Sequence, residues 1–214
     1  NIYIYIKYFI FYLLKRILEL KKTACVFFLI ACLLQTTAPV YSQTISGDIN
    51  LQDVSSGKSF SFSSLSGAKG IVVFFTSEHC PYAKLYEKRI VSLAAELKGL
   101  GIHTVLVNPN DGILSPDDAV EKMKGKSYPF PYLADKQQQC VKMFNAQKTP
   151  EVFLIKASGS NYELVYQGAF DDNPMSEEEV TETYLANAAR ALAAGKAVAK
   201  KTTRPTGCMI KSRQ

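Results

Sequence analysis

The feature that most constrains the fold is an uninterrupted apolar run, Ile71–Phe75, followed five residues later by a cysteine and a proline. All five residues favour β-structure, as in a strand that is buried on both faces of a sheet. After Cys80 and Pro81, apolar residues recur at positions 86, 90, 93 and 97, which is helical spacing, and Gly99 follows as a stop signal. The sequence therefore predicts an α/β protein with Cys80 at a junction between a buried strand and a helix.

The remaining patterns extend this prediction to a sandwich of helices around a central mixed sheet. An amino-terminal β-hairpin is expected, with strands at 45–54 and 59–62 and a turn rich in Ser and Gly. Further extended segments are predicted at 102–107, 129–133, 151–155 and 162–166, and a short helix at 136–144. The segments 151–155 and 162–166 are close enough in the chain to form an antiparallel hairpin.

Two segments carry the signals of a helix start. Ser115 precedes a proline and two acidic residues, which favours Ser as the N-cap and Pro at the first helical position. Ser176 is followed three residues later by Glu179, the pattern of a capping box. The second helix is expected to continue through residues 180, 184, 188 and 192 on one face and to end at Gly195, leaving 196–214 as an irregular basic tail that contains Cys208.

The amino-terminal 42 residues resemble a targeting segment rather than part of the folded domain. Lys21 and Lys22 precede an apolar stretch, 23–34, that has the length of a signal-peptide core and is too short to span a bilayer. Residues 40–42 suit a signal peptidase, so we expect cleavage after Ser42 and export to the periplasm or outer surface of a bacterium. An alternative is a lipoprotein, because residues 29–32 resemble a lipobox with Cys32 as the lipidated residue.

Residues 1–19 are unusual because they form a second apolar stretch ahead of this leader. We interpret them as an over-extended translation with the true start near Leu20. The competing interpretation is an uncleaved anchor that tethers the protein to a membrane. The expected organisation is thus a leader at 1–42, a domain at 43–195 and the tail at 196–214.

Charge and cysteine usage narrow the function classes. The net charge is +6 for the whole chain, but 1–42 contribute five basic residues and one acid, or +4, so the remainder carries only +2. A domain so close to neutral gives no electrostatic reason to expect nucleic-acid binding. Outside the leader the cysteines are Cys80, Cys140 and Cys208, an odd number that suggests one disulfide plus a free thiol, or a reactive thiol that cycles. No metal-ligand pattern or cofactor motif is present, so neither a metal nor a cofactor is expected.

The position of Cys80 favours a reactive thiol. A side chain at a helix amino terminus faces unpaired backbone N–H groups and the positive end of the helix dipole, both of which favour the nucleophilic thiolate. A protonated His79 beside it would act in the same direction. Cys140 instead shares a predicted helix face with Val141 and Phe144, which indicates a buried, inert residue.

These motifs together resemble the thioredoxin-like superfamily. The strand–Cys80–Pro81–helix unit and the later Thr149–Pro150 before a strand match that superfamily's active cysteine and its facing cis-proline loop. The resemblance narrows to the redoxin, or alkyl hydroperoxide reductase/thiol-specific antioxidant, group of peroxiredoxin-like proteins. The segments that carry it are His79–Tyr82, Asn108–Asp111, Pro129–Leu133, Thr149–Phe153, Gly168–Asp172 and Gly207–Cys208. It implies a thioredoxin-like three-layer sandwich over about residues 45–195.

Departures from the family pattern limit what the resemblance implies. Ala83 stands where thioredoxins have the second cysteine of Cys-x-x-Cys, so Cys80 has no resolving partner within the motif. Ser77 fits the Thr/Ser position of peroxiredoxins, but Val73 replaces their Pro, and Pro150 lies where their arginine would align. Cys208, in the Gly-Cys motif of the tail, is the candidate resolving thiol; a tail cysteine that only packs is the alternative.

Three functions follow from these features. The first is an exported thiol-disulfide oxidoreductase in which Cys80 and Cys208 are catalytic and the reductant is an external thiol. Its substrate, a protein disulfide or thiol, would contact Ser77, His79, Pro81, Tyr82, Thr149 and Pro150, with Thr149–Pro150 pairing to an extended peptide. The second is a weak thiol peroxidase that passes through a sulfenic acid. The third is a thioredoxin-fold binding module without catalysis.

Overall fold

The computed structural model describes residues 8–9, 11–13, 16, 43–45, 48–159 and 161–211. The chain divides into two compact units, Asn1–Tyr41 and Ser42–Gln214. In the first unit the described residues are helical. The apolar stretch 23–34, the candidate lipobox and the cleavage site after Ser42 lie outside the described residues, so the leader stays a prediction. No helix in the described part of the chain is both long and apolar enough to cross a membrane.

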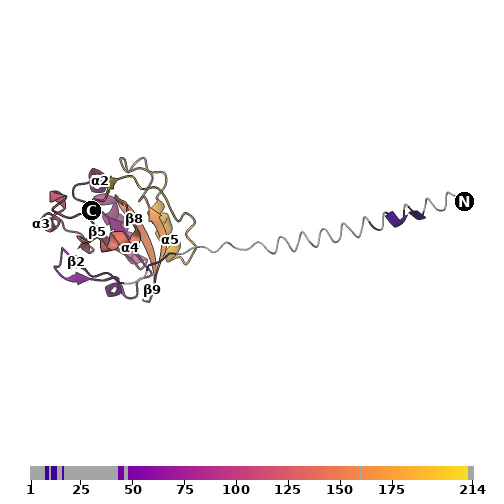
Figure 1. Cartoon of the computed structure of the whole chain (residues 1–214), viewed down its shortest axis with the longest axis horizontal. Helices are drawn as coiled ribbons and strands as arrows, with labels where there is room; N and C mark the ends of the chain where they lie inside the picture. Colours follow the sequence, from indigo (N-terminus) through magenta and orange to yellow (C-terminus); the bar gives the residue numbers. More distant parts are fainter. Residues whose placement is uncertain are drawn as a thin grey trace. The chain divides into compact units, whose positions relative to one another are not determined.

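The second unit is built on a mixed eight-stranded sheet with the order β1-β9-β8-β4-β5-β6-β2-β3 among the described residues (Figure 1). Strand β4 lies near the centre, parallel to β5 and antiparallel to β8, and β8 and β9 form the expected antiparallel hairpin. The strands are β1 (Thr44–Ile45), β2 (Leu51–Asp53), β3 (Ser59–Phe60), β4 (Gly70–Phe75), β5 (Ile102–Asn108), β6 (Tyr132–Ala134), β8 (Glu151–Ser158) and β9 (Asn161–Gly168). A separate two-stranded pair joins β7 (Lys148–Thr149) to β10 (Cys208–Met209).

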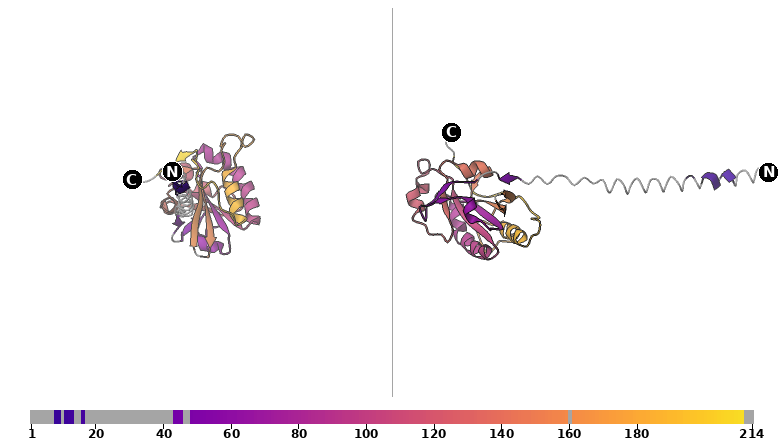
Figure 2. Two further views of the ribbon diagram at one scale, coloured as in Figure 1. Left: turned by 90° about the vertical axis from the view of Figure 1, so that its right-hand side faces the viewer. Right: turned by 90° about the horizontal axis from the view of Figure 1, so that it is seen from below.

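Helices cover both faces of the sheet, which gives the three-layer sandwich that the sequence predicts. Helices α2 (Pro81–Gly99) and α5 (Tyr184–Ala193) lie on the same side of the strands (Figure 2). The other face carries α4 (Gln139–Phe144) and the 3-10 turn η1 (Phe62–Leu65), while η2 (Pro116–Asp118) and α3 (Val120–Met123) follow β5. Along β4, Val72 and Phe74 pack toward α2 and α5, whereas Val73 and Phe75 pack toward α4, so the apolar run is buried on both faces as expected.

The amino-terminal hairpin differs from its prediction in one respect. The expected strand at 45–54 is split: β1 pairs with β9 at one edge of the sheet, and β2 pairs with β3 and β6 at the other. The carboxylate of Asp48 accepts hydrogen bonds from the backbone N–H groups of Ile49, at 2.9 Å, and Phe62, at 2.7 Å. These bonds fold the chain against η1 between the two halves, so only β2 and β3 form the hairpin.

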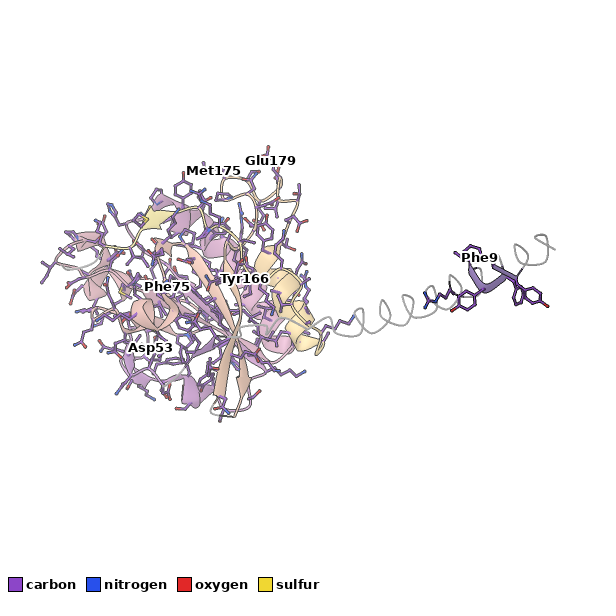
Figure 3. The ribbon with its side chains drawn as sticks, turned by 45° about the vertical axis from the view of Figure 1, so that its right-hand side comes forward. Phe9, Asp53, Phe75, Tyr166, Met175 and Glu179 are labelled. Atoms are coloured by element: carbon purple, nitrogen blue, oxygen red, sulfur yellow. The ribbon has the colours of Figure 1, made fainter. Side chains whose placement is uncertain are left out.

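The capping-box prediction is wrong about where the last helix begins. Helix α5 starts at Tyr184, eight residues after Ser176. The backbone N–H of Ser176 is already bonded to Asn173 Oδ1 at 3.0 Å, and that of Thr181 to Asp172 Oδ1 at 3.0 Å. These side chains hold the segment as a loop, from whose outer edge Met175 and Glu179 project (Figure 3). The helix-start pattern at Ser115 is confirmed in position, because Ser115 is the N-cap and Pro116 the first residue of η2. The Ser115 hydroxyl makes no capping hydrogen bond, and η2 is a short 3-10 turn followed by the four-residue α3.

The tail is not irregular throughout. The backbone N–H of Thr203 donates a 3.0 Å hydrogen bond to Gln167 O on β9, and Thr203 Oγ1 bonds Tyr166 Oη at 2.6 Å. Further on, β10 adds to β7, and Ile210 N–H donates to Gln147 O at 2.9 Å. Residues 201–211 therefore pack along the domain, and this course brings Cys208 to the end of the sheet where Cys80 lies.

Candidate functional site

Cys80 occupies the N-cap of α2, directly after the loop that leaves β4. Its backbone is extended, Pro81 takes the first helical position, and Lys84 N–H donates the first helical bond to Cys80 O at 3.2 Å. Proline suits this position because its missing N–H would have had no partner in the helix. The Cys80 side chain is fully buried, and its Sγ donates to the carbonyl oxygen of Thr149 at 2.9 Å.

The Thr149 carbonyl belongs to a loop that the side chain of Glu151 shapes. The Thr149–Pro150 peptide bond is cis. Glu151 Oε2 accepts the backbone N–H groups of Gln147, at 2.7 Å, and Lys148, at 3.0 Å. Burial raises the pKa of the Glu151 carboxyl, although these two hydrogen bonds oppose the rise. The loop thus presents a defined backbone edge, β7, beside the cysteine.

The chain's own tail lies on this edge. Strand β10, the yellow arrow in Figure 3, pairs antiparallel with β7 so that Cys208 lies opposite Thr149. Burial and a hydrogen bond with the Cys80 side chain raise the pKa of the Cys208 thiol to about 12, and the Asp118 charge adds to this rise. All three cysteines of the domain are free thiols, and Cys208, unlike Cys80, is partly exposed.

Close packing against the loop around Pro150 requires a glycine at position 207, directly before Cys208. A Cβ at this position would lie 2.3 Å from Thr149 O and 2.9 Å from Pro150 Cδ, closer than carbon atoms pack in proteins. Only a glycine lets the tail backbone come this near the cis-proline loop. The Gly207–Cys208 segment therefore packs closely against the loop around Pro150.

The other predicted site residues differ in how far their side chains are exposed. Tyr82 is half-buried and Pro81 exposed on the first turn of α2. His79 is more than half exposed, and its Nδ1 lies 3.5 Å from Asp117 Oδ2. Ser77 is buried, with its hydroxyl bonded at 3.0 Å to Asp118. Contact of these residues with a substrate stays a prediction.

Two buried polar groups near the site were missed by sequence reasoning. Asp118 lies in the first turn of η2, as the helix-start pattern predicts, and its side chain is buried beneath the loop that carries Cys80. Asp171 is also buried, and its carboxylate accepts bonds from Arg89 Nη1 at 2.8 Å and Tyr86 Oη at 2.6 Å. Their sequence neighbours gave no signal, because the partners come from distant segments.

Asp171 also lies beside a cavity at the far side of Pro150. The cavity has a volume of about 220 Å³, and its lining includes Pro150, Phe170, Asp171, Thr203 and Arg204. The described residues form no cluster of three or more His, Cys, Asp or Glu that could hold a metal ion. Cys140, on the opposite layer, is fully buried and its thiol pKa is raised well above the usual value by burial, as its predicted core position requires.

A cysteine at the N-cap of the helix that follows a central strand, beside a cis X-Pro loop that precedes the neighbouring antiparallel strand, is the arrangement of a thioredoxin-like protein of the redoxin class. The comparisons agree and are more specific. The profile of the AhpC/TSA family matches residues 43–160. The chain belongs to the AhpC/TSA family, as the sequence motifs predict.

Solved structures show the same fold. An uncharacterized conserved protein of Geobacillus kaustophilus is 29% identical, with a TM-score of 0.73 over 80% of this chain and 92% of that one. A hypothetical protein of Sinorhizobium meliloti is 30% identical, with a TM-score of 0.71 over 81% and 95%. The peroxidoxin BcpB of Mycobacterium tuberculosis, at 16% identity and a TM-score of 0.51 over 72% and 96%, shares the fold alone. The comparison with curated proteins gave no significant match.

Proposed function

We propose that this protein is a thiol-disulfide oxidoreductase in which Cys80 is the nucleophile and Cys208 the resolving thiol. One observation carries the proposal: β10 lays Cys208 opposite Thr149, the residue whose carbonyl oxygen accepts the Cys80 thiol. The register of β10 on β7 and the hydrogen bond from Cys80 Sγ to Thr149 O bring both cysteines to the same residue of the loop. The resolving partner that thioredoxins carry within the motif, and that Ala83 replaces here, is thus supplied by the tail.

The proposed cycle is balanced in thiols and disulfides. The Cys80 thiolate attacks one sulfur of a substrate disulfide, forms a mixed disulfide and releases the other substrate sulfur as a thiol. Cys208 then gives up its proton and attacks Cys80 Sγ, so that the second substrate thiol leaves and the Cys80–Cys208 disulfide remains. An external thiol reductant returns this disulfide to two thiols by two further exchanges.

A second candidate is a weak thiol peroxidase, which the burial of Cys80 favours. Because the side chain is fully covered, a peroxide reaches it with less displacement of the tail than a protein does. The thiolate would attack the O–O bond, release an alcohol or water, and become a sulfenic acid. Cys208 would then displace water from that acid and form the same disulfide.

We also propose that the domain works outside the cytoplasm. The support is the leader pattern at 1–42. Fractionation of a bacterium that expresses the chain, followed by mass analysis of the amino terminus, tests this proposal. A mature protein starting at residue 43 in the periplasm supports export, a lipidated Cys32 supports the lipoprotein alternative, and an unprocessed cytoplasmic protein contradicts export.

The catalytic proposal is tested by following each thiol over time. The full chain carries Cys25→Ser and Cys32→Ser so that only the three domain thiols report, and mild detergent keeps its leader in solution. The reduced protein receives one equivalent of glutathione disulfide or, separately, hydrogen peroxide. Aliquots are quenched in acid, alkylated and analysed as non-reduced peptides by mass spectrometry.

We expect a Cys80–Cys208 disulfide within seconds, with Cys140 unmodified as the internal control. Cys208→Ser should stop the reaction at a Cys80–glutathione disulfide or a Cys80 sulfenic acid, and Cys80→Ser should stay reduced at Cys208. The faster of the two oxidants decides between the two candidate activities. A Cys80 that stays a free thiol while Cys208 oxidises slowly contradicts both, and leaves a non-catalytic binding module.

A further inference from the structure

Asp118 is a buried carboxylate held entirely by neutral donors. Its side chain is 1% exposed, and among the described residues no Lys, Arg or His forms an ion pair with it. Burial pushes the pKa of Asp118 up, but hydrogen bonds from four side chains outweigh it and hold the pKa below its usual range. Oδ1 accepts from Ser77 Oγ (3.0 Å), Glu78 N (2.6 Å) and Asn108 Nδ2 (2.9 Å), and Oδ2 from Ser77 Oγ (3.0 Å), Asn110 Nδ2 (2.9 Å) and Ser115 Oγ (2.6 Å).

Two of these contacts fix the loop that carries Cys80. Asp118 bonds both the hydroxyl of Ser77 and the backbone N–H of Glu78. Ser77 in turn accepts the N–H of His79 at its hydroxyl, at 3.1 Å, and the N–H of Cys80 at its carbonyl, at 3.3 Å. The Cys80 backbone is therefore held in place through Ser77 by a residue 38 positions further along the chain.

A third contact reaches the tail. Asn110 donates from Nδ2 to Asp118 and accepts at Oδ1 the backbone N–H of Lys211, at 3.2 Å. Gln138 holds the same residue from the other side, since its Nε2 donates to Lys211 O at 2.7 Å. Lys211 lies three residues beyond Cys208, so one hydrogen-bonded network connects the segments that carry the two cysteines.

We propose that Asp118, acting through Asn110, is a positioning residue that aligns Cys208 with Cys80 for disulfide formation. This inference rests on the proposed function. A carboxylate suits the role because it can accept several hydrogen bonds at once, and bonds to a charged acceptor are stronger than neutral ones. Its charge is already satisfied by the network, so it orients two backbone segments without touching a substrate.

The test is the equilibrium between the Cys80–Cys208 disulfide and a reference dithiol at pH 7, which measures how well the two thiols are aligned. The parent is the full chain with the leader cysteines replaced by Ser, and the variant adds Asp118→Asn. We expect the equilibrium constant for disulfide formation to fall at least tenfold, which raises the reduction potential by about 30 mV. The first step, reaction of Cys80 with the oxidant in a Cys208→Ser background, should change less than about threefold in Asn110→Ala, which leaves the bonds from Ser77 and Glu78 to Asp118 in place.

Loss of the Asp118 charge does not change the ionisation of Cys208 at pH 7, where the equilibrium constant for disulfide formation is measured. The groups that act on the Cys208 thiol are Cys80, Asp118 and Lys211, and the pKa of about 12 keeps Cys208 protonated at pH 7. Removing the Asp118 charge lowers that pKa but leaves the thiol neutral at the pH of the assay. A change at pH 7 therefore reports alignment and not a change in the ionisation of Cys208.

Two further variants keep the inference falsifiable. Asn110→Ala removes the hydrogen bond to the backbone N–H of Lys211 while Asp118 stays charged. It should lower the equilibrium constant for disulfide formation as much as Asp118→Asn does. If Asp118→Asn does not fold, Asn110→Ala alone tests the role of this network. Ser115→Ala removes one donor without touching either cysteine segment, and should change the constant less than about threefold. Alkylation of Cys140 in the native protein should be equally slow in all of them, because it reports opening of the core.

The outcomes separate this inference from the proposed function. A parent that forms no Cys80–Cys208 disulfide overturns the proposed function itself. A parent that forms it with the same equilibrium constant as Asp118→Asn and Asn110→Ala overturns only the role of Asp118. If the equilibrium constant for disulfide formation falls and Cys140 is alkylated faster in the same variant, Asp118 stabilises the whole domain. That result also overturns a positioning role.

Discussion

Gly207→Ala is the sharpest perturbation of the contact between the tail and the cis-proline loop. The added Cβ would lie 2.3 Å from Thr149 O and 2.7 Å from Thr149 C, both of them backbone atoms that cannot rotate away. Packed carbon atoms need about 3.0 to 3.4 Å, so the tail must move by about 0.7 to 1.1 Å. That movement opens the β7–β10 pair and carries Cys208 away from Cys80.

The magnitude follows from disulfide geometry. Disulfides form with Cα atoms about 4.4 to 6.8 Å apart, and most lie between about 5.5 and 6 Å. A displacement of about 1 Å moves a pair from the middle of this range to its limit, where strain destabilises the bond. We expect the rate of Cys80–Cys208 disulfide formation in Gly207→Ala to fall at least tenfold, or by about 1.4 kcal/mol in activation free energy.

The assay follows the disulfide in quenched samples of the reduced protein after one equivalent of oxidant. Gly99→Ala is the matched control, because it makes the same chemical change at a glycine where an added Cβ has no neighbour within 4 Å. Tail release should also make Cys80 alkylate faster in Gly207→Ala, because β10 pairs with the loop whose Thr149 carbonyl contacts Cys80 Sγ. Disulfide formation at the parental rate, with Cys80 equally protected, would refute the reasoning.

Three other predictions concern stability. Arg89→Ala leaves Asp171 buried without its cation and should cost about 3–5 kcal/mol in urea unfolding, whereas Arg190→Ala, which breaks an exposed pair with Glu96, should cost less than about 1 kcal/mol. Burial raises the pKa of Asp135 to about 6, although hydrogen bonds from three backbone N–H groups oppose the rise. The folded state therefore binds the Asp135 proton more tightly than the unfolded state. The stability that this proton contributes is fully present below about pH 4 and is lost as the pH rises to about 6. Compared with Asp135→Asn, the parent should lose up to about 3 kcal/mol of unfolding free energy across that range, and a flat difference would contradict the shift. Ser176→Ala should change the unfolding free energy by less than about 0.5 kcal/mol, because Ser176 is not an N-cap; a cost near 1 kcal/mol would show that it caps a helix.

The central elements could be predicted because their patterns are local. The run Ile71–Phe75 must be buried wherever it lies, and the spacing of apolar residues after Pro81 fits only a helix. Cys80 therefore had to stand at the junction of the two, and the structure has it there. Its distance from Thr149 came only through the family resemblance, because no local pattern connects positions 69 residues apart.

The tail could not be predicted, because a strand of two residues is defined by its partner. Basic residues from 196 onward indicate a solvated segment, and nothing within Cys208–Met209 favours β-structure over coil. The pairing depends on β7, whose backbone edge is left open by the loop around Pro150. The burial of Asp118 could not be predicted for a similar reason. Ser-Pro-Asp-Asp correctly predicts a helix start, but the amides of Asn108 and Asn110 that bond the Asp118 carboxylate lie outside that pattern.

Because β10 lies on β7, the position of the tail affects both the access of substrate to Cys80 and the attack of Cys208 on Cys80. The β7 edge, where an extended peptide would pair, is already occupied by the tail, so a protein substrate and Cys208 compete for one site. A mixed disulfide with a protein would hold Cys208 away from Cys80 until the peptide leaves β7. A small oxidant needs no pairing with β7, so after it reacts Cys208 can return to its place and close the disulfide at once. In the cycle we propose, the pairing of β10 with β7 therefore favours rapid closure with small substrates and slow closure with proteins.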